Sequence, residues 1–181
     1  MPVEEEGPQS EVDGEHRRFH DDLLDKLAGE WSVRGTVVGQ EIRHRCSAEW
    51  VLNHQFMRVH FQDVTPRRGT GKEDPPYEAF VFIGYDNMSE RYVGHWLDTF
   101  GGRASETLGF GKRDEGDGSV RSITFVFEGG TGPLQNTLAW NERDATWTMM
   151  IRQKDDRGAW RTFAKETFER TSVAKGPGSR R

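Results

Sequence analysis

The chain has 181 residues, of which 33% are hydrophobic and 30% charged, and its formal net charge is −5. This mildly acidic composition excludes nucleic acid as an expected partner, because phosphate binding needs a basic face. No apolar run approaches the ~20 residues that span a bilayer and no signal peptide opens the chain, so we expect no membrane partner and a cytoplasmic location.

The two ends of the chain differ in composition from its middle. Residues 1–15 are rich in glutamate and aspartate, and residues 172–181 consist mostly of lysine, arginine, glycine, proline and serine. Neither segment has enough apolar side chains to offset the cost of ordering, so we predict a disordered acidic tail at 1–15 and a disordered basic tail at 172–181. The remaining residues, 16–171, suffice for a single domain with a core of its own.

The first predicted element is a short helix at residues 16–28 with one apolar stripe. Its apolar side chains recur at helical spacing: Phe19, Leu23, Leu24 and Leu27. Charged side chains fill positions between them, and Gly29 follows as the residue that ends the helix. From Trp31 onward the period of the apolar pattern changes to two, which is typical of strands.

The clearest strand is predicted at residues 42–52, where two kinds of side chain alternate. One face carries His44, Cys46 and Trp50, and the other is mainly polar or charged. Such alternation means that one face is buried and the other faces water, so we expect the first face to point inward. By the same logic Trp31 points inward from the preceding strand. Cys46 is the single cysteine of the chain, which rules out an internal disulfide and agrees with a reducing compartment.

Eight further strands are expected at short, regular spacing. We predict them at residues 54–64, 77–85, 91–99, 103–112, 119–127, 135–141, 146–153 and 160–170. Polar turns separate most of them. A meander of antiparallel strands with no long crossover favours closure, which leaves no exposed edge. The predicted fold is therefore all-β: a closed up-and-down antiparallel β-barrel of about ten strands with one short N-terminal helix.

One long connection and two strand orientations stay open at this point. The connection at 66–76 contains several glycines and prolines and is either a lid over a barrel mouth or a plain loop. His95 and Trp96 lie on opposite faces of one strand, and either face fits an interior. In the last strand, Glu166 points inward in one register and Phe163 in the other.

Four stretches of sequence stand out by their order and spacing. Residues 27–31 read Leu-Ala-Gly-Glu-Trp, residues 82–86 read Phe-Ile-Gly-Tyr-Asp, residues 91–98 read Arg-Tyr-Val-Gly-His-Trp-Leu-Asp, and residues 166–170 read Glu-Thr-Phe-Glu-Arg. Together they resemble a bacterial calycin-like family of uncharacterised proteins, related to lipocalins, fatty-acid-binding proteins and nitrobindins. The resemblance implies a closed barrel around a pocket for a small ligand, and it implies no particular reaction.

The resemblance also implies a structural pair and bears on one cofactor. In calycins a tryptophan of the first strand commonly packs under an arginine of the last strand, which here would pair Trp31 with Arg170. Nitrobindins bind haem through a histidine on a late strand, but residues 136–170 contain no histidine. Haem is therefore disfavoured, and no cofactor is expected.

Two residues expected to point inward, and a third whose orientation is open, are candidates for chemistry. His44 and Cys46 could bind zinc with a further ligand such as His95 or Glu166, or act as base and nucleophile, although such positions lie about 6.5–7 Å apart. A free cysteine is more often a small core residue, so no metal is expected. Glu166, if it points inward, could accept a hydrogen bond from a ligand or act as a general base.

These patterns favour a binding protein over an enzyme. We expect a small hydrophobic or aromatic molecule in the barrel, contacted by His44, Cys46, Trp50, His95, Trp96 and Glu166. One alternative is an isomerase, cyclase or hydrolase on the same scaffold, with His44 or Glu166 as the catalytic acid or base. The other is a structural or interaction protein with a filled barrel, which could form a homodimer through an outer strand face. The familiar phosphate-loop, dinucleotide and nucleophile-elbow motifs do not occur.

Overall fold

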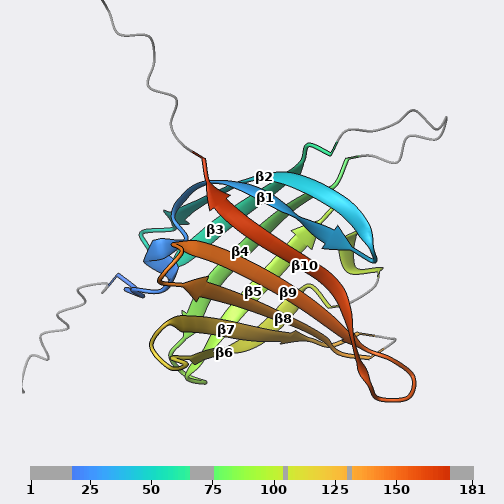
Figure 1. The fold of residues 1–181 in the computed structure, drawn as a ribbon. Coiled ribbons are helices and arrows are strands. Elements are labelled where there is room, and N and C mark those ends of the chain that lie inside the picture. Colours follow the sequence, from blue (N-terminus) through green and yellow to red (C-terminus); the bar gives the residue numbers. More distant parts are fainter. Residues whose placement is uncertain (1–17, 66–75, 104–105, 130–131, 172–181) are drawn as a thin grey trace, which may run out of the picture.

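The computed structural model describes residues 18–65, 76–103, 106–129 and 132–171. Within these residues ten strands form one closed barrel, in which each strand pairs antiparallel with its sequence neighbours and β10 pairs with β1 (Figure 1). In chain order the elements are η1 Leu24–Lys26, β1 Gly29–Val37, β2 Gln40–Val51, β3 Phe56–Asp63, β4 Glu78–Asp86, β5 Arg91–Asp98, η2 Gly101–Arg103, β6 Leu108–Asp114, β7 Val120–Phe127, β8 Leu134–Asn141, β9 Thr146–Lys154 and β10 Trp160–Arg170.

The closed all-β barrel predicted from the alternating pattern is confirmed. The largest difference in strand bounds is at β6, which starts at Leu108 instead of residue 103, where the 3-10 turn η2 (Gly101–Arg103) ends. The predicted tails at 1–15 and 172–181, and almost all of the connection at 66–76, lie outside the described residues.

The predicted N-terminal helix is wrong in type and length. From residue 18 onward, the described part of this segment contains only the 3-10 turn η1. The carboxylate of Asp21 accepts the backbone N–H groups of Leu23 and Leu24 at 2.9 and 2.8 Å. A side chain that binds the backbone two and three residues ahead competes with regular helix formation. Burial of Leu23, Leu24 and Leu27, each fully inaccessible, then holds the segment in place.

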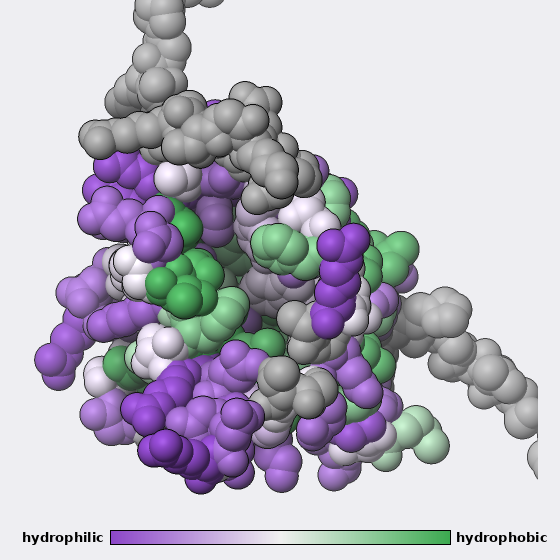
Figure 2. Space-filling view, turned by 90° about the vertical axis from the view of Figure 1, so that its right-hand side faces the viewer, coloured by the Kyte–Doolittle hydropathy of each residue, from purple (hydrophilic) through white to green (hydrophobic). Residues whose placement is uncertain are grey.

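The barrel has one filled end and one hollow end. The η1 segment, residues 21–28, covers the filled end like a plug (Figure 1). Here Lys26 pairs with Glu142, and Asp25 accepts the indole N–H of Trp50. The opposite end carries the β9–β10 hairpin. In space-filling view this end is hollowed, and hydrophobic side chains border the hollow inside a mostly hydrophilic rim (Figure 2).

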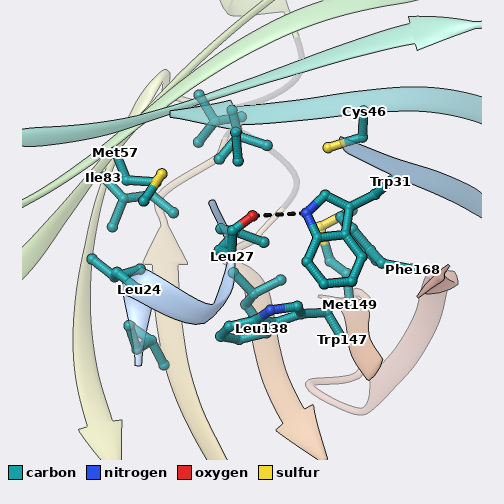
Figure 3. Packing of buried hydrophobic residues seen from close by; sticks show 14 of the residues in the cluster. Leu24, Leu27, Trp31, Cys46, Met57, Ile83, Leu138, Trp147, Met149 and Phe168 are labelled. Atoms are coloured by element: carbon teal, nitrogen blue, oxygen red, sulfur yellow. Dashed lines mark hydrogen bonds between the residues drawn. The ribbon is translucent and has the colours of Figure 1, made fainter. Parts of the chain in front are cut away.

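The η1 segment and the first strand contribute side chains to the same core at the filled end. Trp31, Trp147 and Phe168 are the largest fully buried side chains, and Leu27 reaches in from the η1 segment (Figure 3). The indole N–H of Trp31 donates to the carbonyl of Leu27 at 2.7 Å. The plug and the barrel therefore share one core. Burying each large apolar side chain in it stabilises the fold by roughly 1.5–3 kcal/mol.

Glycines allow aromatic rings to fill one side of this core. The ring of Phe125 on β7 lies against Gly94 of β5 and Gly111 of β6, and a Cβ on either glycine would lie only 3.0 or 2.7 Å from that ring. Any side chain would therefore displace Phe125. This explains the glycine in the 91–98 stretch: its position makes room for a phenylalanine two strands away.

Candidate functional site

A cavity of about 320 Å³ occupies the hollow end of the barrel. This volume falls at the lower end of the range of small-molecule sites, roughly 300–1,000 Å³. Its lining residues are Val37, Ile42, His44, Phe61, Asp63, Tyr77, Trp96, Asp98, Phe100, Gly101, Phe127, Leu134, Asn136, Met149, Ile151, Phe163, Ala164 and Glu166. Most of this wall is aliphatic or aromatic, and a few polar groups interrupt it.

The floor of the cavity separates it from the filled core. Phe61, Trp96, Phe127 and Met149 line both this cavity and a deeper apolar one of about 30 Å³. The deeper space is about the volume that one water molecule takes in the liquid. Of these two cavities, only the one at the hollow end therefore has room for a ligand.

A β-bulge in β10 sets which side chains enter the cavity. Thr162 pairs with Arg152 and Ala164 pairs with Ile151, so Phe163 has no opposite residue on β9. Because a bulge shifts the alternation by one residue, Phe163 and Ala164 both line the cavity. From Ala164 onward the alternation is regular and points Glu166 inward. The sequence leaves open whether Phe163 or Glu166 points inward, and with the bulge both residues line the cavity.

His44 and Glu166 meet across β1. β2 and β10 both pair with β1, with His44 opposite Val33 and Glu166 opposite Gly35. The Nδ1 atom of His44 lies 3.9 Å from Oε2 of Glu166, and the two side chains are 5% and 4% exposed. This separation is too long for a hydrogen bond. Neither atom has a hydrogen-bond partner.

Burial controls the protonation of this pair. Removal from water raises the pKa of Glu166 from 4.5 to about 7, because the charged carboxylate loses its hydration. Burial also lowers the pKa of His44, and the nearby negative charge of Asp63 opposes that shift only in part. Near neutral pH the pair therefore combines a neutral imidazole with a carboxyl group that readily changes its protonation state.

Asn136 of β8 adds a third buried polar group. Its Nδ2 atom lies 3.5 Å from the sulfur of Met149, whereas its Oδ1 atom has no hydrogen-bond partner. The residue is 6% exposed and lines both the cavity and its floor. An unsatisfied buried acceptor costs about 1–3 kcal/mol, so the cavity contains groups that a ligand would satisfy.

Tyr77 and Trp96 form a polar contact within the aromatic part of the wall. The indole N–H of Trp96 donates to the hydroxyl of Tyr77 at 3.1 Å. The ring of Tyr77 lies 5.4 Å from the imidazole of His44. Burial raises the pKa of Tyr77, and the charge of Asp98 raises it further. The phenol is therefore neutral at physiological pH.

The charged part of the described wall is acidic. Asp63, Asp98 and Glu166 line the cavity, and among the described lining residues none is lysine or arginine. Asp63 accepts the backbone N–H of Thr65, and Asp98 accepts that of Phe100. These contacts orient the two aspartates.

The structure brings some of the predicted ligand contacts together and separates others. His44, Trp96 and Glu166 line the cavity. Cys46 lies fully buried, opposite Trp31 and outside the described lining, and burial raises the pKa of its thiol. A buried thiol of raised pKa is a poor nucleophile.

The other two predicted contacts lie away from the cavity. Trp50 is at the filled end, where its ring stacks on His54 at 4.1 Å. His95 follows the outer face of β5, with Nε2 3.4 Å from the hydroxyl of Thr107. The structural pair is in contact: the guanidinium of Arg170 lies 4.4 Å from the centre of the Trp31 ring.

Four further residues line the cavity but are not among the predicted ligand contacts: Asp63, Tyr77, Asp98 and Asn136. The inward position of Asn136 could have been predicted from the sequence, because it shares one face of its strand with Leu138 and Trp140. A polar residue on that face is a candidate for a buried functional group. Asp63 and Asp98 continue the inward phase of β3 and β5 after Phe61 and Trp96, whereas Tyr77 lies just before β4, outside the alternation.

The described residues contain neither a metal-binding cluster nor a membrane-spanning helix. Within residues 18–65, 76–103, 106–129 and 132–171, no group of three or more His, Cys, Asp or Glu side chains is placed to hold a metal ion. In the same part of the chain, no helix has the length and apolar character needed to cross a membrane.

The fold and the site define a closed ten-stranded antiparallel β-barrel with an apolar cavity at one end and buried polar groups in its wall. The chain belongs to the family described as "Protein of unknown function (DUF1579)", which matches residues 16–170. The match runs from before η1 to the end of β10, so it includes the plug and the cavity. Comparison with curated proteins finds no match.

Proposed function

We propose that this protein binds a small, mainly apolar molecule in the cavity at the hollow end of the barrel. The observation that carries the proposal is an apolar wall interrupted by three buried polar atoms that have no partner: His44 Nδ1, Asn136 Oδ1 and Glu166 Oε2. Buried polar groups in folded proteins are nearly always hydrogen-bonded. A ligand with a polar end would satisfy these atoms, while its apolar body would displace water from the wall.

The resemblance to calycins supports the same proposal. A barrel with one filled end and one accessible end is a suitable container, because the plug fixes the depth of the cavity and the other end admits the ligand. The resemblance and the cavity both favour a binding protein. Side chains fill the barrel only at the end that the plug covers, which weighs against a purely structural role.

Binding is tested with a neutral fluorescent probe, N-phenylnaphthylamine, titrated into the purified protein. We expect saturable one-to-one binding that Ala164→Phe weakens by about tenfold or more, because the new ring fills the cavity. Ile151→Trp blocks the same space from β9. Ala139→Phe places an equal ring at an outward position of β8 and serves as the control. Absence of saturable binding, or binding that survives both blocking variants in folded protein, contradicts the proposal.

The His44–Glu166 pair favours a second candidate function, acid–base catalysis in the same cavity. A carboxyl group with a pKa of about 7 can both accept and return a proton near neutral pH. The hydrolase version is tested with p-nitrophenyl butyrate: we expect Glu166→Gln to lower the rate by about 100-fold, and Glu169→Gln, on the outer face of β10, to leave it unchanged. A rate no higher than that of buffer contradicts this version.

A further inference from the structure

We propose that the ligand carries a basic nitrogen, and that its ammonium group binds between Glu166 and His44. This inference rests on the proposed binding function and names the chemical class of the ligand. It is distinct from that function, since a barrel of this kind could equally hold a neutral molecule or a fatty carboxylate.

The hydrogen-bonding capacity of the cavity is the first argument. All three unpartnered atoms can accept a hydrogen bond: an ionised carboxylate oxygen in Glu166, an amide oxygen in Asn136, and Nδ1 of a neutral His44 that carries its proton on Nε2. An ammonium group has three N–H donors, whereas a carboxylate has none. These three acceptor atoms therefore lack hydrogen-bond donors, which a ligand with several N–H groups would supply.

The charge of the wall is the second argument. Glu166 is a buried carboxylate in the wall of the cavity, and none of the described lining residues is a lysine or arginine that could receive an anion. A carboxylate ligand would be placed beside Glu166 without a counter-ion. Like charges held close together are strongly unfavourable away from water, whereas an opposite charge is favourable.

The spacing of the pair is the third argument. Nδ1 of His44 and Oε2 of Glu166 are 3.9 Å apart. A nitrogen about 2.9 Å from each atom completes two hydrogen bonds of ordinary length. The rings of Tyr77 and Phe61 lie 5.4 and 6.2 Å from that of His44. Aromatic faces also attract cations, so the surroundings of the pair favour an ammonium group.

The test uses three probes with one apolar body and different polar ends: naphthylethylamine, naphthylethanol and naphthylacetate. Their dissociation constants are measured by displacement of N-phenylnaphthylamine. We expect the amine to bind about tenfold or more tightly than the carboxylate, with the alcohol between them, because hydrogen bonds between oppositely charged groups are stronger than those between neutral groups. This order in the unmodified protein decides the matter even if a variant fails to fold.

Matched variants assign the preference to one carboxylate. Glu166→Gln keeps the shape and removes the charge, so we expect it to abolish the preference for the amine over the carboxylate. Glu169→Gln removes the same charge on the outer face of β10, where Glu169 pairs with Arg34, and should keep the preference.

The outcomes separate this inference from the proposed function. Equal binding of all three probes, tighter binding of the carboxylate, or a preference that persists in folded Glu166→Gln overturns the basic-nitrogen inference and leaves the binding function standing. Failure of every probe to bind, N-phenylnaphthylamine included, overturns both.

Discussion

At the scale of single residues, Glu166 is a carboxylate held where its charge is unfavourable. It is 4% exposed, its Oε2 atom has no hydrogen-bond partner, and the nearest imidazole nitrogen is 3.9 Å away. A buried carboxylate without a close partner destabilises the fold when it ionises. A buried carboxylate that lowers the stability of the fold is a candidate for a functional role.

Glu166→Gln should therefore make the stability of the protein less dependent on pH. Because burial raises the pKa of Glu166 from 4.5 to about 7, the folded state binds this proton more tightly than the unfolded chain. The resulting stability is fully present below pH 4.5 and is lost as the pH rises through 7. Relative to Glu166→Gln, the unmodified protein should lose about 3 kcal/mol between pH ~4.5 and pH ~8.

Urea unfolding of both proteins across this pH range measures the difference. His44, Cys46 and Tyr77 also face Glu166, but both proteins contain them, so subtraction removes most of their contribution. If the two free energies of unfolding change in parallel with pH, Glu166 does not titrate as described.

Some of these site residues could be predicted from the sequence and others could not. Alternation along residues 42–52 predicted that His44 points inward, and the structure shows it buried. The same alternation could not place Trp50, because a strand of twelve residues runs from one end of the barrel to the other. Residues that share its inner face therefore lie at different depths, and Trp50 reaches the filled end.

At the scale of elements, the contact between the first and last strands closes the barrel. Trp31 and Arg170 are register partners on β1 and β10. The guanidinium of Arg170 lies over the Trp31 ring and donates to the carbonyls of Ala28 and Lys26 at 3.1 and 3.0 Å. One side chain thus joins β10, β1 and the end of the η1 segment.

Arg170→Lys is expected to lower the free energy of unfolding by about 1–2 kcal/mol, because an ammonium group cannot stack flat on the indole while reaching both carbonyls. Arg34→Lys is the control: Arg34 makes an exposed ion pair with Glu169, and its replacement should change stability by less than ~0.5 kcal/mol. Guanidinium unfolding measures both. Equal effects of the two substitutions would show that Arg170 makes no special contact.

The conformation of the η1 plug depends more on the contacts of Asp21 than on helix propensity. Besides the N–H groups of Leu23 and Leu24, its carboxylate accepts the hydroxyl of Tyr92 and lies 3.5 Å from Arg113. The period of the leucines predicted that this segment would be buried, and it is. It could not predict the local conformation, which these side-chain contacts from distant strands determine.

Asp21→Ala should loosen the plug and cost about 3 kcal/mol, because it leaves several buried donors without an acceptor. Asp22→Ala removes the neighbouring exposed carboxylate, which also pairs with Arg113, and should cost no more than ~1 kcal/mol. Thermal unfolding and amide hydrogen exchange at residues 23–27 check the difference. Unchanged exchange at these amides in Asp21→Ala would contradict the role given to Asp21.

At the scale of the whole molecule, the two ends of the barrel have different contents. The filled end contains the η1 plug and the large tryptophans of the core, and the other end contains the cavity with its buried polar atoms. The sequence predicted the barrel because alternation and turn residues are local signals. The cavity depends on how side chains from many strands divide the interior, and on the bulge at Phe163, neither of which is a local property.

The most direct test of the binding account follows two tryptophan indole N–H signals by nuclear magnetic resonance during titration with N-phenylnaphthylamine. Trp96 lines the cavity and donates to Tyr77, whereas Trp50 donates to Asp25 at the filled end. We predict that the Trp96 signal shifts saturably, with one-to-one stoichiometry, while the Trp50 signal stays in place. An unmoved Trp96 signal, or an equal shift at Trp50, would contradict the claim that the hollow end is a binding site.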